Sequence, residues 1–503
     1  MSHPPAAIPR ASTGSWIALA LTVLTLALLP AMAAGHAIPE EISPPPSTLV
    51  DQAPDKISLL YSEEIRILTP EDAQVVDENG TSVLNGNAQV SATNRRVLEI
   101  PLKPGLPDGT YTVRIKFISA DAHIIGSNYV FGIGPGPLEE PYLAGAPSEG
   151  PSRTGAWAVA SRFAELSFLG GLFGLIAFRL LVWAPVWKRR PPEGDEGRTI
   201  LSWGQDVFWA GTGILAVGAM LAEMFMVVVY SAQVFGTTVP TALTDGDGLR
   251  TTIGTTRLGD LVTIRTMLLF AVFVLAASLL MREGGRSDAT PARAGFGRTP
   301  AVLLGGLVTA VIIAISAQGH ASVTPAPRVQ IAADAVHLLA VSTWVTGLAL
   351  TALALWRLPR LGRDGRRRAT EVLHRFSTVA LVTLVVAMLS GLVRTTGELS
   401  DPAQLWETAH GQSVLIKLAL LIPVGALALH NRRILNSLLR MRRTSLDGLR
   451  RVRRAAALEF ALAVVIVVVA SVLVAQPPGR SLAKGSAGPS TVEPAQTALG
   501  PGR

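Results

Sequence analysis

Residues 330–356 read QIAADAVHLLAVSTWVTGLALTALALW, and this stretch decides the fold of the larger part of the chain. About 20 apolar residues suffice for a helix to cross the hydrocarbon core of a bilayer. The stretch is longer than that, so it predicts a transmembrane helix. Its two ionisable residues, Asp334 and His337, are three positions apart and therefore share one helical face. Because a charge at this depth is costly unless it is paired or functional, they are a candidate site inside the membrane.

Seven further apolar stretches predict a polytopic bundle of about eight transmembrane helices. The chain of 503 residues is 49% hydrophobic and 16% charged, whereas a soluble protein carries about 25% charged residues. Nearly all of the excess apolarity lies between Ala156 and Ala475, which places the membrane domain at 156–476. The other stretches lie near 157–183, 206–231, 258–281, 300–318, 374–394, 411–430 and 455–475.

The distribution of arginine and lysine predicts the orientation of this bundle. The loops on one side carry 23 of these residues, and the segments on the other side carry 6. Short cytoplasmic loops retain positive charge. The part that precedes the bundle and a disordered tail, 477–503, are therefore expected outside the cytoplasm. The arginine-rich loops are 184–200, 282–299, 357–373 and 431–455.

The N-terminus has the pattern of a secretory signal peptide over residues 1–35. Arg10 lies in a polar leader, the apolar run 16–29 follows, and small residues suit cleavage after Gly35. An uncleaved anchor helix is the alternative. Cleavage would leave His36 as the first residue, with a free amine and an imidazole on one residue.

Residues 36–134 have the pattern of a small all-β domain. Apolar and polar positions alternate in short runs, separated by turn signals such as Asn79-Gly80. About a hundred residues of short strands predict a β-sandwich or Greek-key barrel. The segment 135–155 is rich in Pro, Gly, Ser and Glu, which predicts a linker to the bundle. The expected strands are 56–61, 73–76, 96–102, 111–119 and 128–133.

Several classes of function lack support in the sequence. The chain has no cysteine, so disulfides, thiolate metal sites and a cysteine nucleophile are excluded. It has no G-x-x-x-x-G-K-[ST] loop, so ATP-driven transport of the P-loop kind is unsupported. The net charge of +8 comes from arginines between apolar runs, which topology explains better than nucleic-acid binding. No motif favours a hydrolase or another enzyme of the soluble type.

Three residues at the two ends of the β-domain form a candidate copper site. Asp121 and His123 follow the expected strand 111–119 and project from one face in extended backbone. With the amine and imidazole of His36, they offer nitrogen and oxygen ligands that suit tetragonal Cu(II). For the D-x-H spacing alone, a solvated Asp and His pair is the alternative.

The β-domain carries short motifs at His36-Ala37, Ser43-Pro44, Tyr61-Ser62-Glu63, Ser119 to His123 and Tyr129 to Ile133. With these motifs, nearly all of 36–134 resembles the CopC family of periplasmic copper-binding proteins. The resemblance implies a cupredoxin-like barrel in which His36 chelates copper and Asp121 and His123 complete the site. Ala122 stands where the family usually has glycine. Some members carry a methionine-rich Cu(I) loop, but this domain contains no methionine.

Other residues of the bundle extend the candidate membrane site. His320 lies just outside the fourth expected span, and Met220 and Met224 share a face of the second. Thioethers suit Cu(I), and imidazole suits either oxidation state of copper. Packing is the alternative role for the two methionines.

The bundle has motifs at Gly319-His320-Ala321, Asp334-x-x-His337 with Trp344 and Gly347, Arg375-Phe376-Ser377, His410-Gly411, Lys417, Asn431-Arg432 and Glu459. With these motifs, most of 157–477 resembles the CopD family, the inner-membrane partner of CopC. His410 stands where the family frequently has tyrosine. The resemblance implies copper transport or copper resistance as the function.

These observations together predict a copper protein of the bacterial cell membrane, with copper ions and the lipid bilayer as its partners. The β-domain would capture Cu(II) outside and pass it near His320 to a site at Asp334 and His337, where Cu(I) can also bind. One alternative is a sequestration or sensing protein that the bundle only anchors. The other is a redox protein in which His337, His374 and His430 hold haem.

Overall fold

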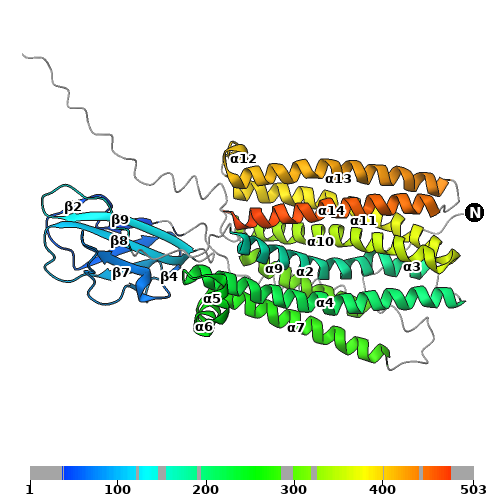
Figure 1. The fold of residues 1–503 in the computed structure, drawn as a ribbon, viewed down its shortest axis with the longest axis horizontal. Coiled ribbons are helices and arrows are strands. Elements are labelled where there is room, and N and C mark those ends of the chain that lie inside the picture. The colour runs from blue at the N-terminus through cyan, green and yellow to red at the C-terminus, as the bar shows by residue number, and fades with distance from the viewer. Residues whose placement is uncertain are drawn as a thin grey trace, which may run out of the picture.

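The computed structural model describes residues 37, 39–119, 124–144, 155–189, 194–284, 298–318, 326–399, 401–440 and 446–476. The expected signal peptide and tail lie outside the described residues, as do four of the candidate ligands: His36, Asp121, His123 and His320. A β-domain and a helical bundle follow one another along the long axis of the molecule (Figure 1).

The β-domain consists of two sheets that share one core. The first has the strand order β1-β3-β7-β6, and its pairs are antiparallel. In the second, of order β2-β9-β8-β4, β5 also pairs with β8. The strands are β1 (Pro39–Ser43), β2 (Leu49–Val50), β3 (Lys56–Tyr61), β4 (Ile65–Arg66), β5 (Ala73–Val76), β6 (Gln89–Val90), β7 (Val97–Pro101), β8 (Gly109–Ser119) and β9 (Ile124–Ile133).

Alternation of side chains along the strands builds the core of this domain. On β3, Ile57, Leu59 and Tyr61 are buried, while the residues between them are less so. They pack with buried residues of the second sheet such as Phe117 and Phe131. The prediction of an all-β sandwich is confirmed.

The expected linker begins as part of the β-domain surface. Residues 135–144 lie along β8, where the backbone amide of Tyr142 donates to the hydroxyl of Thr112 over 2.9 Å. The guanidinium group of Arg114 donates to the carbonyl of Ala144 over 2.6 Å. The first ten residues of the expected linker therefore belong to the surface of the β-domain.

Eight of the described helices are long and apolar enough to cross a membrane, as predicted. Each contains one of the expected spans. Three shorter helices, α5 (Val239–Thr244), α6 (Gly246–Thr255) and α12 (Gln404–Glu407), lie at the end of the bundle that faces the β-domain (Figure 1). The long helices are α2 (Ala156–Phe178), which continues through a π-helical turn (Arg179–Trp183) into α3 (Ala184–Arg189), α4 (Gly194–Val234), α7 (Arg257–Gly284), α9 (Arg298–Gln318), α10 (Pro327–Arg357), α11 (Arg363–Glu398), α13 (Ala409–Arg440) and α14 (Leu446–Ala475).

Helix α10, which carries Asp334 and His337, packs against α2, α9, α11 and α14. Glycines let its neighbours approach closely. A Cβ atom added at Gly174 of α2 would lie 2.3 Å from the backbone carbonyl oxygen of Ser342, and one at Gly347 would lie 2.2 Å from the ring of Phe376 on α11. The candidate residues on α10 are therefore surrounded by other helices.

The β-domain rests on α4, α6 and α7. At the ends of β8 and β9, Ile118 and Ile124 pack in a cluster with Met226, Tyr230 and Leu258 of the bundle. The ammonium group of Lys116 donates to the carbonyl of Val234, and the guanidinium group of Arg66 donates to the carbonyl of Thr255. Val234 and Thr255 are the last residues of α4 and α6, where helical carbonyls lack partners within the helix. Two cations thus join the β-domain to two helix ends.

Candidate functional site

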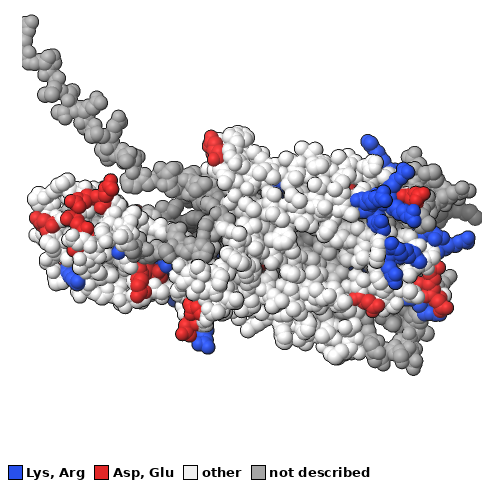
Figure 2. Space-filling view, viewed as in Figure 1, with Lys and Arg blue, Asp and Glu red and all other residues white. Residues whose placement is uncertain are grey.

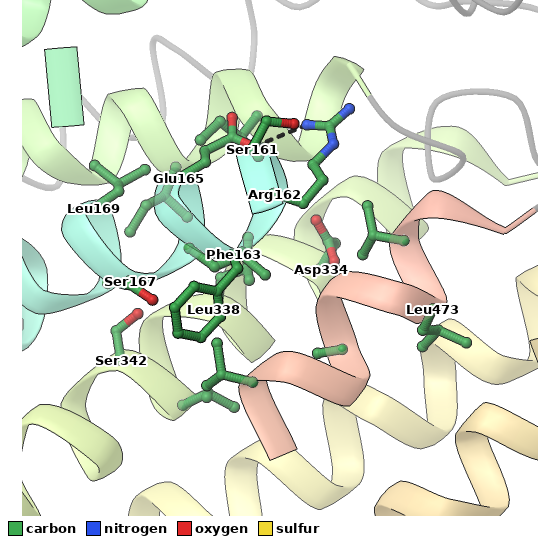
Figure 3. Close-up of a pocket in the computed structure, with 18 of the residues that line it drawn as sticks. Ser161, Arg162, Phe163, Glu165, Ser167, Leu169, Asp334, Leu338, Ser342 and Leu473 are labelled. Atoms are coloured by element: carbon green, nitrogen blue, oxygen red, sulfur yellow. Dashed lines mark hydrogen bonds and ion pairs between the residues drawn. The ribbon is translucent and has the colours of Figure 1, made fainter. Parts of the chain in front are cut away.

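A cavity of about 420 Å³ opens between the helices at the end of the bundle that faces the β-domain. It is lined by residues of α2, α4, α7, α9, α10, α11, α13 and α14, and by Ile124 of β9. Figure 3 shows the Arg162–Glu165 ion pair of α2 and, across from it, Asp334 of α10 and Leu473 of α14. On α10 the lining extends from Asp334 to Ala349, which corresponds to about 20 Å of helix. The cavity therefore reaches well into the apolar part of the bundle.

Asp334 lies in the wall of this cavity and is held by an arginine of the neighbouring helix. Its Oδ1 is 2.9 Å from Nε of Arg394 on α11. The same guanidinium group pairs with Glu398 at 2.9 Å, and the second carboxylate oxygen of Glu398 is 3.1 Å from Nε2 of His410 on α13. A chain of polar contacts thus joins three helices, and it neutralises the charge that made Asp334 conspicuous in the sequence.

His337 also lines the cavity, and its hydrogen bonding defines its tautomer. Its Nδ1 lies 2.9 Å from the backbone carbonyl oxygen of Ala387 on α11. A carbonyl only accepts hydrogen bonds, so this nitrogen carries the proton of the neutral ring, and Nε2 keeps its lone pair. Metal-binding histidines are commonly oriented in this way, with the second nitrogen donating to a carbonyl or carboxylate. Nε2 of His337 could therefore accept a hydrogen bond or bind a metal ion, whereas Asp334 pairs with Arg394.

The two methionines are not brought together with this pair. Met224 is 44% exposed on the outer surface of the bundle, and Met220 packs against the apolar cluster between α2, α7 and α9. Neither lines the cavity, but Met226 does. Four of the residues expected to bind copper (His36, Asp121, His123 and His320) lie outside the described residues. Within the described part of the chain, no group of three or more His, Asp or Glu residues could hold a metal ion.

Two parts of the chain match the models of known protein families. Residues 40–134 match the family model of the CopC domain, and residues 370–473 match that of copper resistance protein D, CopD. The chain is a CopC–CopD fusion. It is a multi-pass membrane protein of the copper resistance and transport families.

Relatives of the fusion include one protein that matches most of its length and smaller proteins that match about a quarter of it. The Copper transport protein CutJ of Bacillus subtilis is 26% identical over 472 residues, covering 92% of the fusion and 77% of the relative. Protein YobA of Escherichia coli is 28% identical over 123 residues, covering 24% of the fusion and 98% of YobA. Among solved structures, CopC from Methylosinus trichosporium OB3b is 25% identical, covers 21% of the fusion and 100% of its own chain, and has a TM-score of 0.18. The methionine-rich copper resistance protein PcoC of Escherichia coli is 26% identical, covers 20% of the fusion and 99% of its own chain, and has a TM-score of 0.17.

A second charged cluster of the fusion contains Arg265, a residue that the sequence analysis did not single out. Arg265 of α7 is fully buried and pairs with Glu223 of α4 at 2.6 Å and with Glu165 of α2 at 3.7 Å. Glu165 pairs in addition with Arg162 at 2.8 Å, and Arg265 donates to the side chain of Gln318 over 2.5 Å. Arg265 could have been identified by the criterion used for Asp334, because it is also a charged residue inside an apolar span.

The histidines considered for haem do not form a pair in the fusion. His374 of α11 and His430 of α13 are both exposed on the surface of the bundle. His337 lines the cavity, with Nδ1 committed to Ala387. Because haem ligands must face one another across an interior space, these positions argue against the haem alternative.

Proposed function

We propose that the fusion takes up copper across the cytoplasmic membrane. In this proposal the β-domain captures Cu(II) through His36, Asp121 and His123, and the cavity of the bundle receives the copper at His337. The family assignment to copper resistance and transport proteins supports copper as the cargo. The direction of transport and the copper ligands go beyond this family assignment and are part of the proposal.

The observation that carries this proposal is the contact between the β8–β9 hairpin and the cavity. Ser119 ends β8 and Ile124 begins β9, so Asp121 and His123 belong to the short connection between them. Ile124 itself lines the cavity. In the sequence, Asp121 lies three residues and His123 one residue before Ile124. Copper released from them would have a short path into the bundle.

The arginine distribution supports an extracytoplasmic β-domain. Figure 2 shows lysine and arginine side chains gathered at the end of the bundle remote from the β-domain. Short loops with many such residues stay in the cytoplasm. With cleavage after Gly35, His36 would then begin the mature chain on the outside. Mass spectrometry of the mature N-terminus tests this step, and a chain that begins elsewhere contradicts the proposed ligand set.

Within the bundle, we propose that His337 is the main copper ligand of the cavity. Its Nε2 carries a lone pair, and imidazole binds copper in either oxidation state. His320 is proposed as a ligand at the entrance because Gln318, two residues before it, lines the cavity. Asp334 would contribute charge rather than a ligand atom. Of the methionines, Met226 is better placed than Met220 or Met224.

Copper accumulation in cells tests the capture step. Cells that express the fusion under copper limitation should hold more copper than cells without it. The double substitution Asp121→Ala with His123→Ala should bring the copper content down to that of cells without the fusion, because the capture site is lost. Asp51→Ala, at an exposed aspartate of the same domain, is the matched control and should have no effect. Unchanged accumulation in the double variant contradicts the capture step, and a lower copper content in cells with the fusion indicates export instead.

Sequestration or sensing by an anchored β-domain is the second candidate function. It is favoured by the lack of a three-ligand group among the described residues of the bundle. The substitution His337→Ala distinguishes the two functions, with the exposed His374→Ala as its control. A transporter should lose copper accumulation with His337→Ala while the β-domain still binds Cu(II). A protein that only anchors its β-domain should tolerate both substitutions equally.

A further inference from the structure

Lys417 is a charged residue that the proposed transport path does not yet use. It lies on α13, seven residues after His410, so the two residues occupy nearly the same helical face about 10 Å apart along the axis. Both line the cavity. In the described part of the chain, no hydrogen bond or ion pair of Lys417 is found, whereas Arg394, Asp334 and Glu398 all take part in ion pairs.

Lys417 completes a set of four charges that sums to zero. The charged groups whose fields act on it are Arg394, Glu398 and Asp334. Two cations and two carboxylates therefore line the cavity together. The second cluster, consisting of Arg162, Glu165, Glu223 and Arg265, is balanced in the same way. The cavity in its metal-free form is thus electrically neutral.

The two histidines of the cavity do not change this balance. His337 is neutral in the tautomer that donates to Ala387. A neutral His410 ring can donate from Nε2 to the carboxylate of Glu398. Its other ring nitrogen, Nδ1, is buried and has no hydrogen-bond partner among the described residues. A second N–H on His410 would therefore be a buried donor without an acceptor, which is unfavourable.

A metal cation that binds at His337 would disturb this neutrality between apolar membrane-spanning helices. Charges interact strongly where the dielectric constant is low, so an added positive charge must be compensated. The carboxylates are already ionised and held by Arg394, and a guanidinium group does not lose its proton in proteins. The ammonium group of Lys417 is the one cation among the described cavity residues that can lose its proton.

We propose that Lys417 exchanges a proton for a univalent metal ion, so that each Cu(I) or Ag(I) bound at His337 releases one proton from the lysine. The ammonium group becomes a neutral amine, the proton leaves through the water of the cavity, and the net charge of the site stays zero. No electron is transferred in this step. The inference rests on His337 of the proposed copper path, concerns copper that is already Cu(I) when it reaches this residue, and adds to the path an opposing proton flow. The titratable and charged groups that line the cavity together with Lys417 are Arg162 and Glu165 from α2, Tyr230 from α4, Asp334 and His337 from α10, Arg394 and Glu398 from α11, and His410 from α13.

Proton release on metal binding by the purified full-length protein tests this inference. The protein carries Asp121→Ala and His123→Ala, so that the bundle alone is titrated, and the probes are Ag(I) and Cu(I) supplied as its acetonitrile complex. A pH indicator in weakly buffered solution should report one proton per metal ion. The dissociation constant should fall about tenfold from about pH 7 to about pH 8, because binding and deprotonation are linked.

Two substitutions of Lys417 give opposite shifts in affinity. Lys417→Arg keeps a cation that cannot deprotonate, so metal binding should weaken by about tenfold or more and release no proton. Lys417→Met removes the cation, so the metal should bind at least as tightly as in the parent protein, with neither proton release nor pH dependence. Lys56→Arg, at an exposed lysine of the β-domain, should behave like the parent protein. His337→Ala should abolish both binding and proton release.

Several results would overturn the inference: metal binding without proton release in the parent protein, undiminished proton release in Lys417→Arg, or no metal binding by the bundle at all. Copper accumulation in cells is measured in parallel for the same variants. Transport without proton release would reject the exchange and leave the proposed function standing. Proton release without transport would reject the proposed function and leave the exchange standing.

Discussion

Arg265 of α7 and Glu223 of α4 form an ion pair of 2.6 Å in which the two side chains are 0% and 2% exposed. Taking two such charges out of water is expensive, and the pair is stable only while both partners are present. Glu165 and Gln318 complete the surroundings of the guanidinium group and thereby join α2, α4, α7 and α9. This cluster includes α4 and α7, two of the helices on which the β-domain rests.

We expect Arg265→Leu to destabilise the bundle by about 3–5 kcal/mol, because it leaves the carboxylate of Glu223 buried without a partner. Arg265→Leu combined with Glu223→Leu should recover more than half of that loss. Thermal unfolding of the protein in detergent measures both effects. The control is Arg250→Ala, whose ion pair with Asp247 is exposed and should contribute nothing measurable. A single variant that is as stable as the parent protein would mean that water reaches this cluster.

Lys116 connects the buried carboxylate of Asp72, at 2.9 Å, to the end of α4. We expect Lys116→Met to destabilise the β-domain by roughly 3 kcal/mol, since Asp72 is 5% exposed and would lose its cation. Hydrogen exchange of the β8 peptides in the full-length protein should then become faster. Adding Asp72→Asn should restore much of the protection. Lys56→Met, which removes the exposed pair with Glu99, is the control and should leave β8 unchanged.

Gly347 is required by the close packing of α10 on α11. A Cβ atom at this position would lie 2.2 Å from the ring of Phe376, so Gly347→Ala should cost about 1–3 kcal/mol through overpacking. Gly213→Ala on α4 provides the comparison, because nothing lies within 4 Å of the added atom. Thermal unfolding should therefore give a lower melting temperature for Gly347→Ala than for Gly213→Ala, although both replace glycine with alanine. Equal melting temperatures for both would contradict the packing argument.

The sequence predicted most of the fold because the relevant signals are local. Apolar runs of sufficient length identified all eight long helices, and alternation identified β3 at its observed bounds, Lys56–Tyr61. The ends of the helices were predicted less accurately. Helix α4 extends from Gly194 to Val234, beyond the expected 206–231, because polar residues continue the helix past the apolar run. Strands of two residues, such as β4, exist only through pairing with a distant partner, and alternation cannot reveal them.

The candidate site was predictable in part. Asp334 and His337 do share the cavity, as their spacing indicated, but their partners could not be read from α10 alone. Arg394 is 60 positions from Asp334 in the chain, and Ala387 meets His337 through its backbone. Helix periodicity places residues on faces, whereas the choice of neighbouring helix depends on packing between helices. Lys417 and Arg265 could have been identified in the same way as Asp334, because each is a charged residue within an apolar span.

Contact between Ile118 and the bundle should be needed for copper transfer but not for copper capture. Ile118 is 6% exposed and packs with Met226 and Tyr230, so Ile118→Asp places a charge in an apolar contact and should separate the β-domain from α4. Copper accumulation in cells should then fall roughly tenfold, because a tether alone gives a lower effective concentration than a docked domain. Cu(II) titration of the same purified variant should match the parent protein. The control is Leu49→Asp on β2, where the side chain is already 51% exposed. If Ile118→Asp transports copper normally, the β-domain delivers its metal without docking, and the path through Ile124 is wrong.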